Sequence, residues 1–157
     1  MLITADQIVA HLVGDYILQS DWMATEKTKR SIAAAVHVLC YSLPFLFLRP
    51  SLMTWSFIVV THFVIDRWRL ARYVAWVKNF LAPPFQFAET CGCAEWSDAW
   101  MRQRWHETWR PGGHAPWPGC DKTGYPNDRP VWLATWLLII TDNTMHLICN
   151  GIALKWM

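Results

Sequence analysis

The chain carries few charged residues and few signs of a secreted protein. Only 17% of its 157 residues are Asp, Glu, Lys or Arg, well below the roughly 25% of an average soluble domain. The formal net charge is +2, and the longest basic run is Lys27-Thr28-Lys29-Arg30. We therefore expect no nucleic-acid partner. The first residues lack a basic region and a small-residue cleavage site, so we expect no removable signal peptide. Five cysteines, an odd number, do not indicate a disulfide framework.

Apolar residues, in contrast, make up 54% of the chain and gather in four segments. The first is long enough to cross the roughly 30 Å core of a bilayer at about 1.5 Å per residue. The sequence predicts an all-α, polytopic membrane protein in which a four-helix transmembrane bundle forms a single membrane domain, 1–157. The predicted spans are about 3 to 22, 31 to 48, 51 to 66 with an amphipathic interfacial extension to about 80, and 130 to 156.

Residues 83–129 interrupt this pattern with proline, glycine, cysteine and tryptophan, which predicts a polar extramembrane insert. Its tryptophans repeat at helical spacing, which indicates either a short interfacial helix or a plain packing stripe. Cys91, Cys93 and Cys120 are candidate ligands of a structural zinc ion, although Cys-x-Cys lacks the two-residue gap that is usual in zinc knuckles.

Basic residues predict how the spans are oriented. Of the 14 lysines and arginines, 12 lie between the first and second or between the third and fourth segments. The positive-inside rule then places both connections, including the insert, in the cytoplasm and both termini outside it. We expect an integral protein of a bacterial inner membrane. In this orientation most of the ionisable residues within the spans fall at a similar depth.

Seven ionisable residues stand inside the apolar segments. Each costs a few kcal/mol or more in a bilayer unless it is paired, hydrated or bound to a metal. Three pairs have the spacing i, i+4, which puts both side chains on one helix face. The seven predicted metal ligands are His11, Asp15, His37, His62, Asp66, Asp142 and His146.

Imidazole and carboxylate ligands together suit Zn, Mn or Fe, and we favour Zn. Seven ligands are too many for one four-coordinate ion, so we expect two divalent ions bridged by Asp15 or Asp66. Such a pair generates hydroxide near neutral pH and clamps phosphoryl oxygens. The expected function is a membrane-embedded metal-dependent hydrolase acting on a phosphoester or related bond of a lipid or lipid-linked substrate. Its nucleophile would be a metal-bound hydroxide, and its catalytic carboxylates Asp15, Asp66 and Asp142.

Other polar residues near the proposed ligands have two interpretations each. Gln19 and Asn143 are candidates for orienting the ligands or for hydrogen bonding between helices. Arg67, Arg69 and Lys27 are candidates for binding a substrate phosphate, or they only follow the positive-inside rule.

The same residues carry a resemblance to a known family. The segment His11-Leu-Val-Gly-Asp15-Tyr-Ile-Leu-Gln19, then Asp21-Trp22-Met23-Ala24, Lys27, His37 with Tyr41, His62-Phe-Val-Ile-Asp66 and Asp142-x3-His146 resembles the bacterial and phage membrane-protein family known as domain of unknown function 3307. The resemblance covers the four segments but not the insert. It implies a relation to membrane-bound metal-dependent hydrolases and is compatible with a phage origin. Asn143, where the family more often has Gln, and Arg67, in a stretch where Lys is usual, depart from the pattern.

Two rival functions stay open. The polar stripe could form a hydrated relay in a proton- or ion-coupled transporter or channel. Alternatively, the chain could be a non-enzymatic envelope interaction protein, phage-encoded or not, in which a metal only holds four short helices together. A homo-oligomer is also left open, as are the identity of the metal and of the substrate.

Overall fold

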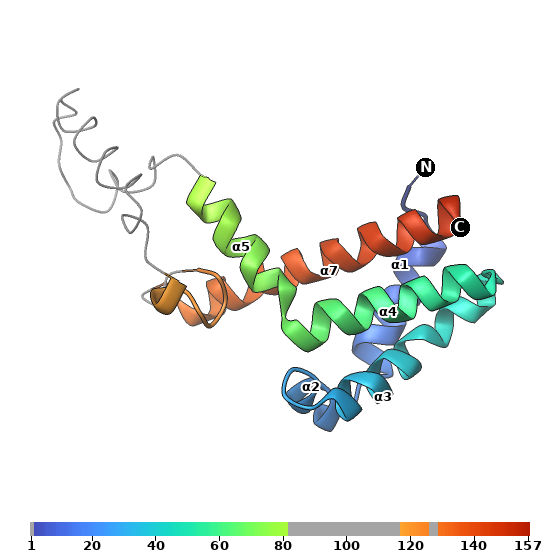
Figure 1. The fold of residues 1–157 in the computed structure, drawn as a ribbon, viewed down its shortest axis with the longest axis horizontal. Helices are drawn as coiled ribbons and strands as arrows, with labels where there is room; N and C mark the ends of the chain where they lie inside the picture. The colour runs from blue at the N-terminus through green and yellow to red at the C-terminus, as the bar shows by residue number, and fades with distance from the viewer. Residues whose placement is uncertain (1, 82–116, 126–128) are drawn as a thin grey trace, which may run out of the picture. The chain divides into compact units, whose positions relative to one another are not determined.

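The described part of the chain is helical. The computed structural model describes residues 2–81, 117–125 and 129–157, and within these ranges it contains helices and no strand (Figure 1). This confirms the predicted all-α class. The chain divides into two compact units, one of Met1–Ala71 with Ile139–Met157 and one of Arg72–Leu138. Cys91, Cys93 and the predicted helix of the insert lie outside the described residues.

The first unit contains the residues that the sequence predicts as ligands. Its helices coincide with the predicted spans to within a few residues, except in the first span. They are α1 (Ala5–Leu12), the π-helical turn η1 (Val13–Ile17), α2 (Asp21–Glu26), α3 (Ser31–Ser42), the 3-10 turn η2 (Pro44–Leu48), α4 (Leu52–Trp68) and the C-terminal part of α7 (Val131–Trp156).

Side-chain caps set where several helices begin. The hydroxyls of Thr4 and Ser51 accept hydrogen bonds from backbone N–H groups at the starts of α1 and α4, which satisfies donors that a helix leaves unpaired. Ser20 does the same for α2 and thereby breaks the predicted span 3–22. The continuous helix 5–17 is only about 20 Å long, shorter than a bilayer core.

Among the described residues, two helical stretches are long and apolar enough to cross a membrane, judged by length and composition. Ser31–Leu48, which is α3 with η2, has a mean hydropathy of 1.9, and Val131–Trp156, which is α7, has a mean hydropathy of 1.3. The α-helix of the first stretch gives way to a 3-10 turn at Pro44, because proline cannot donate the next helical hydrogen bond.

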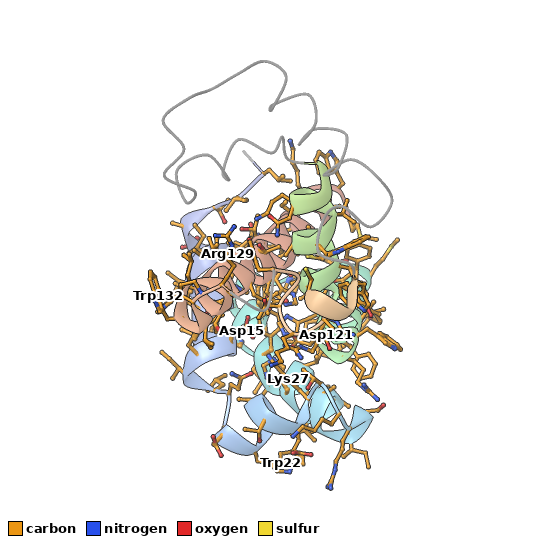
Figure 2. All side chains as sticks on the ribbon, turned by 90° about the vertical axis from the view of Figure 1, so that its left-hand side faces the viewer. Asp15, Trp22, Lys27, Asp121, Arg129 and Trp132 are labelled. Carbon is orange, nitrogen blue, oxygen red and sulfur yellow. The ribbon has the colours of Figure 1, made fainter. Side chains whose placement is uncertain are left out.

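The polarity of the first unit is inverted relative to that of a soluble domain. Phe47, Leu52 and Ile32 are 89%, 79% and 76% exposed, whereas four histidines and two aspartates are buried. Figure 2 shows Asp15 and Lys27 among the helices and Trp22 projecting outward. A large exposed apolar surface indicates contact with a membrane or a partner, and inward-facing ionisable residues are typical of membrane-embedded helices.

A small apolar cluster lies beside these polar residues, since its member Tyr41 stacks on His62. Tyr41, Phe45 and Ile58 are fully buried and pack with Ala10 and Ala153. Gly14 lets η1 approach α3 closely, since a Cβ at this position would lie 2.6 Å from the Tyr41 carbonyl oxygen. The close approach sets the position of the next residue, Asp15.

The second unit includes most of α5 (Leu70–Leu81), the 3-10 turn η4 (Trp117–Gly119) and the start of α7. The ring of Trp117 stacks on Tyr73 at 4.8 Å, with the Arg72 guanidinium 5.3 Å from the indole centre. Lys78 donates a hydrogen bond to the Tyr125 hydroxyl. Residues 117–125 of the predicted insert therefore pack on α5.

Candidate metal centre

Four helical elements of the first unit bring six predicted ligands together. Asp15 comes from η1, His37 from α3, and His62 and Asp66 from α4, while α7 contributes Asp142 and His146. All are buried except Asp142, whose side chain is 28% exposed. Two groups have ligand atoms within 4.8 Å of one another and could hold a metal ion. We call Asp15, His37, His62 and Asp66 the tetrad, and Asp66, Asp142 and His146 the trio.

Five of the six distances between the donor atoms of the tetrad are close to those of a tetrahedron. His37 Nε2 lies 3.3 Å from Asp15 Oδ1 and 3.0 Å from Asp66 Oδ2. His62 Nε2 lies 3.5 Å and 3.1 Å from the same oxygens, and the two nitrogens are 3.0 Å apart. Zinc bonds of 2.0–2.1 Å in a tetrahedron separate neighbouring ligand atoms by about 3.3 Å. Five of the six edges of the tetrad therefore have lengths that suit one small divalent ion.

One proton does not satisfy all the donor atoms of the tetrad. A proton shared by His37 Nε2 and His62 Nε2, which are 3.0 Å apart, leaves Asp15 Oδ1 without a donor. This oxygen is buried and finds no hydrogen-bond partner in the described part of the chain. Because buried polar atoms are rarely left unpaired, a cation shared by this oxygen and the Nε2 lone pairs fits the arrangement.

Asp66 links the tetrad to the trio. Its Oδ2 faces the tetrad, and its Oδ1 lies 3.4 Å from His146 Nε2. The same His146 nitrogen is 3.4 Å from Asp142 Oδ2. One carboxylate that offers separate oxygens to two ligand groups is the arrangement that a pair of bridged ions requires. Of the two bridging candidates that the sequence offers, Asp66 belongs to both groups and Asp15 to the tetrad alone.

Stacked rings fix the orientation of the histidines. The Tyr41 ring lies on His62 at 3.6 Å, and His62 lies on His146 at 3.9 Å. The Tyr41 hydroxyl accepts a hydrogen bond from Asn150 Nδ2. A side chain that holds a ligand's ring in place limits the cost of ordering the site. Asn150 is a functional candidate that sequence reasoning missed. Its position as a polar residue in an otherwise apolar helix is the signal that could have identified it.

His11, predicted as a ligand, lies outside both groups. Its Nδ1 is 3.0 Å from the Tyr41 hydroxyl and its Nε2 is 2.7 Å from Asn143 Oδ1. The distance from His11 Nε2 to Asp15 Oδ2 is 3.7 Å, so the i, i+4 pair shares a helix face without a hydrogen bond. Both ring nitrogens are engaged elsewhere, and His11 is placed to hold Tyr41 and Asn143.

Lys27 lies against the tetrad. Its Nζ is 2.9 Å from Asp66 Oδ2 and 3.3 Å from His37 Nε2, and its side chain is 16% exposed. Burial lowers the pKa of this ammonium, but the carboxylates of Asp66 and Asp15 outweigh burial and hold the pKa above its usual value. The Lys27 ammonium therefore already neutralises part of the negative charge of the tetrad.

The other predicted polar residues lie in different surroundings. Arg67 donates to the Thr28 carbonyl oxygen at 2.8 Å and to Ser31 Oγ at 3.2 Å, so it ties the end of α4 to the α2–α3 connection. Arg69 ends α4 in the left-handed conformation. Gln19 has a buried Oε1 without a hydrogen-bond partner among the described residues. Cys120 is buried in the second unit.

Comparison with known proteins identifies a family but no individual curated protein or solved structure. No curated protein and no solved structure matches the chain. A family model described as "Protein of unknown function (DUF3307)" matches residues 3–85, which is more than half of the chain and includes the whole tetrad. Asp142 and His146, which complete the trio, lie beyond the matched residues. The chain belongs to this family, as its histidine and aspartate motifs indicate.

Proposed function

We propose that the protein is a membrane-embedded, metal-dependent hydrolase of a phosphoester or related bond in a lipid or lipid-linked substrate. The observation that carries the proposal is the tetrad, in which two imidazole nitrogens and two carboxylate oxygens lie at tetrahedral separations inside a buried site. Imidazole with carboxylate is a ligand set that suits Zn, with Mn and Fe as alternatives.

The residues of the centre form two ion sites and orient the ligands of these sites. The tetrad holds one ion, and the trio, through the second oxygen of Asp66, holds another. Ions in such a pair activate water near neutral pH and stabilise charge on phosphoryl oxygens. Asp142, half-buried, lies at the accessible side of the centre. Tyr41 and His11 orient the histidine rings.

The surroundings of the centre support a lipid substrate. The helices that carry the ligands expose many large apolar side chains, which favours contact with hydrocarbon over contact with water. In this proposal α1 with η1 and α4 join the two longer stretches as spans of a four-helix bundle, with both termini outside the cytoplasm. The short first span is accommodated by local bilayer thinning.

Removal of metal tests the proposal. Protein purified without chelators is expected to contain one to two divalent ions per chain, by elemental analysis, and to hydrolyse a phospholipid or a phosphodiester analogue. Chelation is expected to abolish hydrolysis, and readdition of Zn or Mn to restore it. Lysozyme treated in parallel controls for adventitious metal. A metal content far below one ion per chain, unchanged in His62→Ala, would falsify the proposal.

A second candidate function rests on Lys27. Its ammonium bridges Asp66 and His37 within the buried polar network, and a lysine, two aspartates and histidines in contact are also the parts of a proton or ion relay. In that case the protein moves ions across the bilayer, and vesicles that contain it show uptake or conductance without hydrolysis of head groups.

Lys27→Met separates the two candidates. In a metal centre, loss of an ammonium 2.9 Å from Asp66 Oδ2 removes a competing cation, so the affinity for a divalent ion is expected to rise about tenfold, or roughly 1.4 kcal/mol. In a relay, the same change removes a carrier of charge and abolishes transport. Isothermal titration with Zn and a vesicle uptake assay measure the two effects. Lys29→Met, which removes a 64% exposed lysine paired with Glu26, is the matched control.

A further inference from the structure

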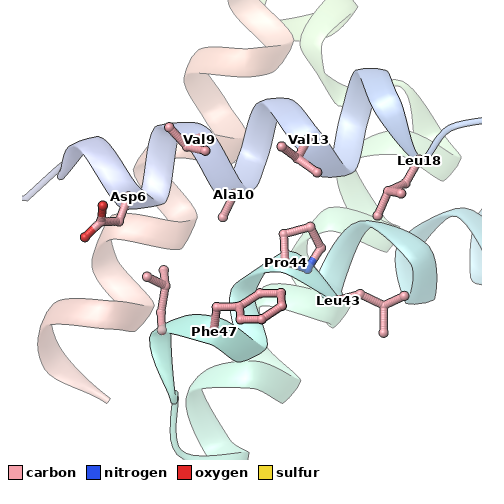
Figure 3. A pocket seen from close by; sticks show the side chains of 9 residues that line it. Asp6, Val9, Ala10, Val13, Leu18, Leu43, Pro44 and Phe47 are labelled. Carbon is pink, nitrogen blue, oxygen red and sulfur yellow. The ribbon is translucent and has the colours of Figure 1, made fainter.

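An apolar groove runs along the first unit between α1 with η1 and the α3–η2 stretch (Figure 3). Val9, Ala10 and Val13 form one wall, and Leu43, Pro44 and Phe47 form the other. The groove encloses about 660 Å³, within the range of small-molecule sites. It is distinct from the tetrad, since none of its lining residues is a ligand of either group.

The two ends of the groove differ in charge. Asp6, an exposed carboxylate, lies at one end, and Leu18 lies at the other (Figure 3). The Leu18 end directly follows η1, the turn that carries Asp15 into the tetrad. Along the helix the two ends are about 18 Å apart at 1.5 Å per residue, nearly the full length of the helix 5–17.

We propose that this groove holds one acyl chain of a membrane lipid, with the lipid head group at the Leu18 end. A hydrocarbon chain needs no hydrogen bonds, and between Asp6 and Leu18 every lining side chain is apolar. An extended peptide segment would leave its backbone polar groups unpaired in such a groove. Asp6 repels the phosphate of a head group from its own end, which sets the direction of the lipid.

The groove continues into surfaces that face hydrocarbon. Its second wall belongs to Ser31–Leu48, the more apolar of the two stretches able to cross a membrane. Phe47 and Val9 on its rims are 89% and 60% exposed, so the groove opens directly onto the surface that lipid would cover. A lipid held here has its head group beside the turn of Asp15, which deepens the proposed function and rests on it for the substrate class.

Photocrosslinking tests the groove independently of the metal. The full chain is placed in vesicles of phosphatidylethanolamine and phosphatidylglycerol that contain phosphatidylglycerol with a diazirine on one acyl chain, and crosslinked residues are mapped by mass spectrometry. Groove residues are expected to be labelled severalfold more than equally exposed apolar residues elsewhere. Val9→Trp, which fills the groove, is expected to abolish this excess. Val60→Trp is the matched control, because Val60 on α4 is 59% exposed and does not line the groove.

The outcomes separate the groove from the metal centre. Labelling that stays concentrated in the groove in His62→Ala supports the acyl-chain site whatever the metal content of that variant. Labelling spread evenly over exposed apolar residues overturns it while leaving the metal analysis to decide the proposed function. Equal loss of labelling in Val9→Trp and Val60→Trp also overturns it.

Discussion

Asp66→Asn is expected to remove both divalent ions from the protein and to abolish hydrolysis. Asp66 is the one residue that the tetrad and the trio share, and each of its oxygens faces a different group. Loss of a residue that only orients a ligand costs about 10–100-fold in metal affinity, so loss of a bridging ligand is expected to cost at least as much at each site. Elemental analysis and Zn titration of the purified variant measure the loss.

A graded series makes this result specific. Asp142→Asn alters the trio alone and is expected to remove one ion and keep the other. Asp6→Asn, an exposed carboxylate outside both groups, is expected to keep both. Asp66→Asn leaves the Lys27 ammonium buried without its carboxylate, and an unpaired buried charge destabilises the fold. The double variant Lys27→Met/Asp66→Asn removes this charge, so a loss of metal in it is not explained by misfolding from that cause. Retention of the wild-type metal content in the folded double variant would contradict the two-ion centre.

The sequence predicts the ligand pairs well because helical spacing is local information. His62 with Asp66 and Asp142 with His146 are four residues apart on long helices, and each pair lies on one face as expected. His11 with Asp15 has the same spacing, yet His11 faces Tyr41 and Asn143. Spacing alone cannot distinguish these cases, because the difference depends on which neighbouring helix each ring meets.

Long-range contacts explain what sequence reasoning did not find. The sequence offers Lys27 either as a ligand of a substrate phosphate or as a residue that follows the positive-inside rule, whereas its ammonium lies 2.9 Å from Asp66 Oδ2, 39 positions along the chain. The π-helical turn that carries Asp15 depends on its close approach to α3, whereas the break of the first span at Ser20 comes from a local N-cap, to which hydropathy is insensitive. π-Helical turns are frequent at functional residues, but the composition of the sequence does not predict where such a turn forms.

Gly14→Ala is expected to weaken metal binding without altering any ligand. The new Cβ would lie 2.6 Å from the Tyr41 carbonyl oxygen and 2.7 Å from the Tyr41 ring. The Tyr41 carbonyl oxygen belongs to the backbone of α3 and cannot rotate away as a side chain can, so η1 and α3 must move apart. Alanine gains about 1 kcal/mol over glycine in a helix, but overpacking of this kind costs about 1–3 kcal/mol or more. The expected net result is a lower unfolding temperature in detergent.

The larger effect falls on the centre, because Asp15 follows Gly14 directly and contributes its Oδ1 to the tetrad at 3.3–3.5 Å from the two histidine nitrogens. Displacement of η1 moves this oxygen away from the other ligand atoms, so Zn affinity is expected to fall at least tenfold, a loss of roughly 1.4 kcal/mol or more in binding free energy. Leu12→Ala, a truncation at a 45% exposed position of the neighbouring helical turn, is expected to leave the affinity unchanged. If Gly14→Ala binds Zn as tightly as the unsubstituted protein, the contact of η1 with Tyr41 does not position Asp15, and the tetrad must be held together by α3 and α4 alone.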